Sequence, residues 1–126
     1  MYNIVELFSV KKMLLRMQKP DRGDMAAMND KMKEMHFDEL FQAILLLKTE
    51  DEVRAFFEDI CTVNEMKAML QRLQVAEMLD RGAQYSHIVA TTGASTATIS
   101  RVNRCLQYGS DGYHLVLDRL RQQEEA

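Results

Sequence analysis

The chain has 126 residues, of which 47% are apolar, and it carries a net charge of −3. This length and composition suit one domain with a modest core, so a disordered chain is excluded. No stretch reaches the about 18 consecutive apolar residues of a membrane span, so we expect no membrane partner. The net negative charge, taken alone, argues weakly against a nucleic-acid partner.

Residues 1–27 form a segment of different character, in which apolar residues alternate with basic ones. The pattern predicts a basic amphipathic helix that ends before Pro20. Its early Glu6 and late bases reverse the charge order of a secretory signal, so we do not expect one. The segment is either an added docking helix or the result of a start assigned too early. The domain proper is predicted to span residues 28–126.

Beyond this segment, apolar residues at helical spacing predict a series of helices, with no alternation long enough for a strand. The first helix covers about Phe37–Leu47 and is apolar on more than one face. Two capping boxes, Thr49–Glu52 and Thr62–Glu65, begin the next two helices, because the threonine hydroxyl and the glutamate carboxylate each satisfy an amide of the other residue. Gly82 ends the second of these helices, and Asp111 is placed to cap the last one.

The stretch Tyr85–Leu106 predicts two short helices joined by a tight turn. Gly93 can adopt positive φ and so suits the end of the first helix, and Ser95 is placed to cap the second. One side of the second helix carries Ile99, Val102 and Leu106, and the other carries Ala97, Ser100, Arg101 and Arg104. A surface of small, hydroxyl and guanidinium groups fits a major groove. The pattern therefore predicts a helix-turn-helix that reads double-stranded DNA.

The charge is distributed unevenly along the chain. Between Glu34 and Glu65 there are nine acids and two bases, a net charge of −7. Between Met66 and Tyr108 there are five bases and two acids, a net charge of +3. An acidic body followed by a basic segment fits a DNA-binding protein, although ordinary solvated surface charge would look the same.

The apolar content of the helices before residue 61 favours a homodimer. These short helices carry more large apolar groups than a domain of about 100 residues can bury alone. A single helix-turn-helix also makes few contacts, and two-fold pairing on a palindromic site is the usual solution. The alternative is a monomer in which the N-terminal helices cover the rest of the domain.

No residue set in the sequence suggests catalysis or a metal. Cys61 and Cys105 are far apart with no CxxC pair, and we interpret them as small reduced residues of a cytoplasmic protein. The three histidines are scattered rather than set at ligand spacing. No nucleophile–base–acid set or phosphate-cradling glycine loop occurs. We therefore expect no enzyme, no metal and no cofactor.

Three runs of the chain resemble a known family. They are FFEDICTVNE (Phe56–Glu65), QRLQVAEMLDRG (Gln71–Gly82) and TTGASTATISRVNRCLQYGSDGY (Thr91–Tyr113). From about Met28 to Glu125 the chain resembles the Trp-repressor-related YerC/YecD family of bacterial proteins. More distantly, TGASTATISR (Thr92–Arg101) is similar to the DNA-reading segment of the tryptophan repressor. The resemblance implies an all-α, Trp-repressor-like helical bundle that forms an intertwined homodimer.

The resemblance also implies which residues contact DNA. The positions that contact bases in the tryptophan repressor are held here by Thr96, Ala97 and Ser100, and its first motif helix contributes near Ser86 and Val89. An apolar Val89 does not suit a polar contact. The full set of candidate DNA-binding residues is Ser86, Ser95, Thr96, Ala97, Ser100, Arg101 and Arg104.

The family's effector pocket is only partly matched. Two arginines sandwich the indole in the tryptophan repressor, and Arg72 and Arg101 match them here. Val102 stands where the repressor has glycine, and Cys105 stands where it has serine. A β-branched side chain fills the space that a hydrogen left open, so we expect that L-tryptophan is not the ligand. Otherwise Arg72 is a structural ion-pair partner and Arg101 a phosphate contact, and whether any effector binds stays open.

Two functions fit these features. The first is a sequence-specific DNA-binding transcriptional regulator that binds palindromic DNA as a dimer through a recognition helix at residues 95–106. The second is a protein-interaction module that has the helix-turn-helix shape but does not read DNA, which the modest positive charge and the acidic body would suit.

Overall fold

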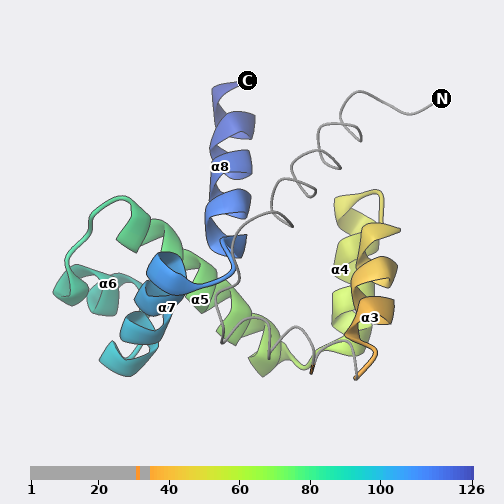
Figure 1. The fold of residues 1–126 in the computed structure, drawn as a ribbon, viewed down its shortest axis with the longest axis horizontal. Coiled ribbons are helices and arrows are strands. Elements are labelled where there is room, and N and C mark those ends of the chain that lie inside the picture. The colour runs from red at the N-terminus through yellow and green to blue at the C-terminus, as the bar shows by residue number, and fades with distance from the viewer. Residues whose placement is uncertain (1–30, 32–34) are drawn as a thin grey trace. The chain divides into compact units, whose positions relative to one another are not determined.

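The computed structural model describes Lys31 and residues 35–126. These residues form α3 (Phe37–Leu45), α4 (Glu50–Ile60), α5 (Val63–Asp80), α6 (Tyr85–Thr92), α7 (Thr96–Tyr108) and α8 (Gly112–Glu125), with no strand among them (Figure 1). The prediction of an all-α fold is confirmed. The helix predicted within residues 1–27 and the boundary predicted at Met28 lie outside the described residues. No described helix is both long enough and apolar enough to cross a membrane.

The chain divides into two compact units, residues 1–38 and residues 39–126. Helices α4 to α8 lie wholly in the second unit. Within it, α6, α7 and α8 all pack against α5, and α7 also contacts α6 and α8 (Figure 1). We call this group of helices, residues 71–126, the head.

One apolar core holds the head together. Its buried members come from all four helices of the head and from the turn between α6 and α7, and they are Val75, Ala76, Ile88, Ala94, Ile99, Val102 and Leu117. Fully burying one valine or isoleucine contributes about 1.5–3 kcal/mol. The motif helices α6 and α7 are therefore fixed to α5 by their inward-facing side chains.

Each of the two predicted capping boxes forms one of its two expected hydrogen bonds, the one to the threonine hydroxyl. The Thr49 hydroxyl accepts the Glu52 amide at 3.2 Å, and the Thr62 hydroxyl accepts the Glu65 amide at 3.1 Å. The Thr49 hydroxyl also donates to the Glu52 carboxylate at 3.2 Å. The reciprocal bond from a threonine amide to a glutamate carboxylate does not form in either described box. One orphan amide of each helix is thus satisfied by a side chain.

The predicted end of α5 is confirmed, and the predicted cap of α8 is wrong in part. Gly82 follows α5 at a φ of +84°, as a glycine that ends a helix should. Asp111 occupies the N-cap position of α8, but its φ is +63° and its side chain makes no capping hydrogen bond. Its carbonyl instead accepts the Leu115 amide at 3.0 Å. The left-handed backbone turns the carboxylate away from the amides that it was expected to cap.

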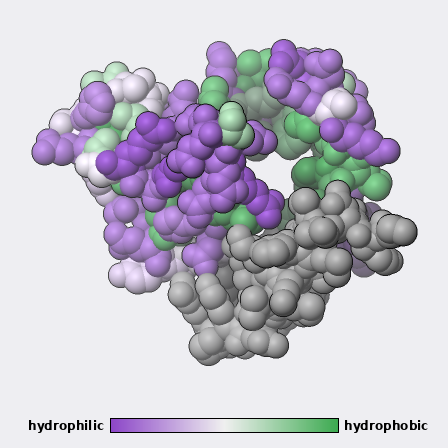
Figure 2. All heavy atoms as spheres, turned by 90° about the horizontal axis from the view of Figure 1, so that it is seen from above, coloured by the Kyte–Doolittle hydropathy of each residue, from purple (hydrophilic) through white to green (hydrophobic). Residues whose placement is uncertain are grey.

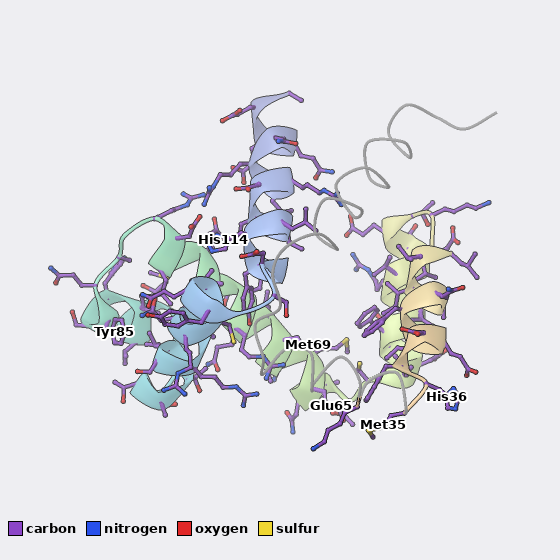
Figure 3. The ribbon with its side chains drawn as sticks, viewed as in Figure 1. Met35, His36, Glu65, Met69, Tyr85 and His114 are labelled. Atoms are coloured by element: carbon purple, nitrogen blue, oxygen red, sulfur yellow. The ribbon has the colours of Figure 1, made fainter. Side chains whose placement is uncertain are left out.

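Two side chains hold α8 against its neighbours. His114, in the first turn of α8, has its Nε2 atom 2.8 Å from the Leu106 carbonyl of α7 (Figure 3). Its Nδ1 atom lies 3.8 Å from a carboxylate oxygen of Asp80, at the end of α5. Arg121 pairs with the same carboxylate. The last helix is thus tied both to the end of α5 and to the last turns of α7.

The helices before the head bury much less. Neither α3 nor α4 contains a fully buried residue. Large apolar side chains are exposed on both helices, at Leu46 just after α3, and on the first half of α5; on the helices they are Phe41, Leu45, Val53, Ile60, Val63 and Leu70. Figure 2 shows apolar surface in green over this part of the chain. An apolar area of this extent is typical of a surface that another protein covers.

Candidate nucleic-acid interface

The turn between α6 and α7 has a defined geometry. Gly93 has a φ of +71°, and its amide donates to the Val89 carbonyl at 2.9 Å. The Thr92 hydroxyl accepts the amide of Ala94, which is fully buried, at 3.2 Å. From α5, the Gln71 side-chain amide donates to the Thr92 carbonyl at 3.1 Å. Because the turn is held from both sides, the angle between the two motif helices is set by the fold.

Ser95 begins α7 as predicted. Its hydroxyl accepts the Thr98 amide at 3.2 Å and lies 3.0 Å from the Thr98 hydroxyl. Both contacts join the cap residue to the first turn of α7. The prediction of Ser95 as a cap is confirmed, whereas its role at DNA stays a prediction.

The two sides of α7 face as the sequence predicted. Ile99 and Val102 are buried in the head and Leu106 is half-buried. The four residues assigned to the other side, Ala97, Ser100, Arg101 and Arg104, are all exposed. Thr96, at the start of the helix, and Ser86, on α6, are exposed as well. With Ser95 also exposed, all seven candidate DNA-binding residues lie on the surface.

The polar groups of this surface are available to a partner. The hydroxyls of Ser86, Thr96 and Ser100 make no hydrogen bond with any described residue. Neither Arg101 nor Arg104 pairs with a carboxylate of the described chain. Hydroxyl and guanidinium groups that no neighbour occupies can meet phosphates and base edges without breaking an existing bond.

The motif contains no acid. From Arg81 to Ser110 there is no aspartate or glutamate, while three arginines occur, so the net charge of this stretch is +3. The acids that border it are Asp80, which pairs with Arg121, and Asp111. A polyanion approaching α6 and α7 therefore meets no carboxylate from the motif itself.

The residues of the predicted effector pocket gather around a tyrosine that the sequence pattern did not single out. Burial raises the pKa of Tyr113, the Arg72 guanidinium opposes this rise, Cys105 adds to it, and Arg101 opposes it. The groups that act on this tyrosine of α8 therefore come from both α5 and α7. No pattern in the sequence linked Tyr113 to the two arginines.

Val102 does not line an open pocket. It is 1% exposed and belongs to the core of the head. Arg72, Arg101 and Cys105 are exposed, and Arg72 forms no ion pair with a described carboxylate. The interpretation of Arg72 as a structural ion-pair partner therefore finds no support among the described residues. Arg72 and Arg101 are present as the resemblance implies, but the residue that follows Arg101 is a valine packed in the core.

Comparison with known proteins identifies the family. The model of the Trp repressor protein family matches residues 35–121 of the chain. The chain belongs to the Trp repressor family. The match spans all of the described helices except the last few residues of α8, and it confirms the family resemblance seen in the sequence.

Three relatives of this Trp repressor family member are informative. The protein YerC of Bacillus subtilis, described as uncharacterized, is 52% identical over 95 residues, which are 75% of this chain and 91% of YerC. A TrpR-like protein from Eubacterium eligens is 55% identical with a TM-score of 0.69, covering 72% of this chain and 94% of its own. A Staphylococcus aureus protein described as a candidate Trp repressor is 49% identical with a TM-score of 0.67, covering 71% and 93%.

Family membership also bears on the class of function. The Trp repressor family consists of regulators rather than enzymes. The prediction that this chain is not an enzyme is confirmed on that basis. Within the described residues no group of His, Cys, Asp or Glu is arranged to hold a metal ion.

Proposed function

We propose that this chain is a sequence-specific DNA-binding transcriptional regulator that binds palindromic DNA as a homodimer through the helix at residues 95–106. The observation that carries the proposal is the surface of the motif: exposed hydroxyls and unpaired arginines on α7, within a stretch of 30 residues without an acid. The small Ala97 side chain allows the helix backbone to approach the groove closely.

The affinity of this surface would come mainly from phosphates. Arg101 and Arg104 are exposed and lie three residues apart, so they share one side of α7. Each phosphate that such a guanidinium neutralises releases condensed counterions, and binding therefore weakens as salt is added. Selectivity would come from Thr96, Ala97 and Ser100, and from the spacing of two half-sites.

The exposed apolar surface of α3, α4 and the first half of α5 supports the homodimer. Leu45 is 82% exposed and Val63 is 62% exposed, although both belong to amphipathic patterns that should face an interior. A second copy would bury these groups, and it would carry a second reading helix. Two-fold symmetry would then place the two motifs on the half-sites of a palindrome.

We propose further that this regulator does not take L-tryptophan as its effector. The side chain of Val102 is packed into the core at the position where the tryptophan repressor has glycine. Moving it aside to admit an indole would disturb the contacts that hold α7 on α5.

The proposal is tested by selecting bound fragments from random DNA with the purified full chain. We expect one palindromic motif to be enriched. A Ser100→Glu variant should lose binding to that fragment in a mobility shift assay, because it places a carboxylate against the phosphates. The control is Glu124→Gln, a change of charge at an exposed position near the end of α8. Enrichment of no motif, or full binding by the Ser100→Glu variant, contradicts the proposal.

A second function, a protein-interaction module, is favoured by one observation. The first turn of α4 carries Glu50, Asp51 and Glu52, close in sequence to the exposed apolar groups of α3. Such a surface suits a protein partner with basic and apolar groups. If the random-DNA selection yields no motif while the protein remains folded and dimeric, this function replaces the first.

A further inference from the structure

Val89 is an apolar side chain on the surface of the motif. It is 37% exposed and lies outside the core of the head, whereas its neighbour Ile88 is completely buried. A valine cannot form hydrogen bonds with water or with a base edge, so its exposure costs free energy unless a partner covers it. The resemblance to the tryptophan repressor implies a DNA contact from the first motif helix near this position, and a valine there can contribute only an apolar contact.

The position of Val89 places it beside the reading helix. Its carbonyl accepts the Gly93 amide at 2.9 Å, so it lies in the last turn of α6, at the entry to the turn. Ser86 is three residues earlier and also exposed, and residues at this spacing share one side of a helix. A duplex that receives the start of α7 would meet this side of α6 next.

The edges of the bases offer one apolar group in the major groove, the 5-methyl group of thymine. Hydroxyls such as those of Ser86 and Thr96 can bond to several bases, since each is both donor and acceptor. Among the exposed residues of α6 and α7, Gln107 in the last turn of α7 is the one amide that could read adenine, and no exposed aspartate or glutamate is available to read cytosine. Ala97 on α7 is also exposed, but Val89 is the largest exposed aliphatic side chain of the two helices and can cover a methyl group more fully.

From this geometry we infer that Val89 contacts the 5-methyl group of a thymine and selects a T·A pair at that position in each half-site. The inference rests on the proposed function, because it concerns the same DNA surface. It adds the class of base that the surface prefers and the residue that selects it.

The experiment replaces each thymine of the selected fragment by deoxyuridine, one position at a time, which removes only the methyl group. For one thymine in each half-site we expect affinity to fall about fourfold, the value that follows from about 0.8 kcal/mol for one buried methyl group. The Val89→Ala variant should bind the thymine and deoxyuridine fragments with affinities within about twofold of each other, since its shorter side chain leaves the methyl group uncovered.

Val116→Ala is the matched control, because Val116 is an exposed valine on α8, outside the motif. This variant should keep the full discrimination between thymine and deoxyuridine. The inference is overturned if every deoxyuridine fragment binds as tightly as its parent, or if the Val89→Ala variant discriminates as strongly as the original chain. If the random-DNA selection returns no motif at all, the proposed function fails first and the inference fails with it.

Discussion

The Gly109 amide donates to the Cys105 carbonyl at 2.8 Å, and a β-carbon at position 109 would lie only 2.3 Å from that carbonyl oxygen. The opposing atom belongs to the backbone of α7, so it cannot swing aside as the end of a flexible side chain could. The chain can pass from α7 to α8 along this path only with a glycine at that position.

Replacing Gly109 with alanine should therefore destabilise the head. We expect the free energy of unfolding to fall by about 1–3 kcal/mol, the range for forced overpacking. Chemical denaturation of the full chain measures it. The control is Gly112→Ala, because a β-carbon there meets nothing within 4 Å and alanine favours a helix. Equal stability of the Gly109→Ala variant and the original chain would show that the close approach does not persist in solution.

Arg104 is expected to bind a phosphate. An Arg104→Ala variant should bind the selected fragment more weakly, and its affinity should depend less steeply on salt, by about 0.9 in the slope for each phosphate that the protein no longer neutralises. A titration of affinity against salt concentration measures both effects. Arg119→Ala removes an exposed arginine of α8 and should leave the slope unchanged. An unchanged slope for Arg104→Ala would place Arg104 outside the interface.

L-tryptophan should not bind. Val102 is 1% exposed and packed in the core of the head, at the position where the tryptophan repressor has glycine, so we expect no room for an indole beside it. We expect isothermal titration calorimetry of the full chain with L-tryptophan to give no saturable heat at micromolar concentrations. A clear micromolar binding curve would mean that α7 can move away from α5 far enough to admit the ligand.

Tyr113 should ionise at a higher pH than a free tyrosine. Its pKa is raised above 10.0 by burial, against the opposing effect of Arg72. Because the folded pKa is the higher one, this residue stabilises the fold below about pH 10, and the contribution disappears as the pH rises through the folded pKa. Spectrophotometric titration should show that the Arg72→Gln variant raises the pKa of Tyr113 further, and that the Tyr113→Phe variant lacks this step. A lower pKa of Tyr113 in the Arg72→Gln variant would contradict the electrostatic influence of Arg72 on this tyrosine.

The dimer should depend on the apolar surface before the head. Leu70 is 55% exposed on α5, and Leu70→Glu would put a charge into the proposed interface. We expect this variant to sediment as a monomer at concentrations where the original chain is dimeric. Ala68→Glu adds the same charge on another side of α5 and should stay dimeric. A dimeric Leu70→Glu variant would place the interface elsewhere.

The sequence predicted the features that depend on neighbouring residues. The caps at Thr49, Thr62 and Ser95, the glycine turn at Gly93 and the inward face of α7 are all local, and each is confirmed. The failure at Asp111 is also local. A residue other than glycine at positive φ is uncommon, and although aspartate adopts it more often than most residues, the sequence does not show which aspartate does so.

Contacts between helices could not be predicted in the same way. The pairing of Arg121 with Asp80 spans 41 residues, and no periodicity relates two such distant positions. The same holds for the influence of Arg72 and Cys105 on the pKa of Tyr113, since these three residues belong to three different helices. The exposed apolar surface was expected from the crowding of large side chains, but which of them remain uncovered depends on how α3 and α4 fold.

The bond between His114 and the Leu106 carbonyl has a practical consequence for anyone who attaches a tag or a fluorescent fusion to this protein. The bond anchors the first turn of α8, and Ala126 lies about three turns further along that helix, so a fusion added after Ala126 should leave the reading helix free for binding measurements.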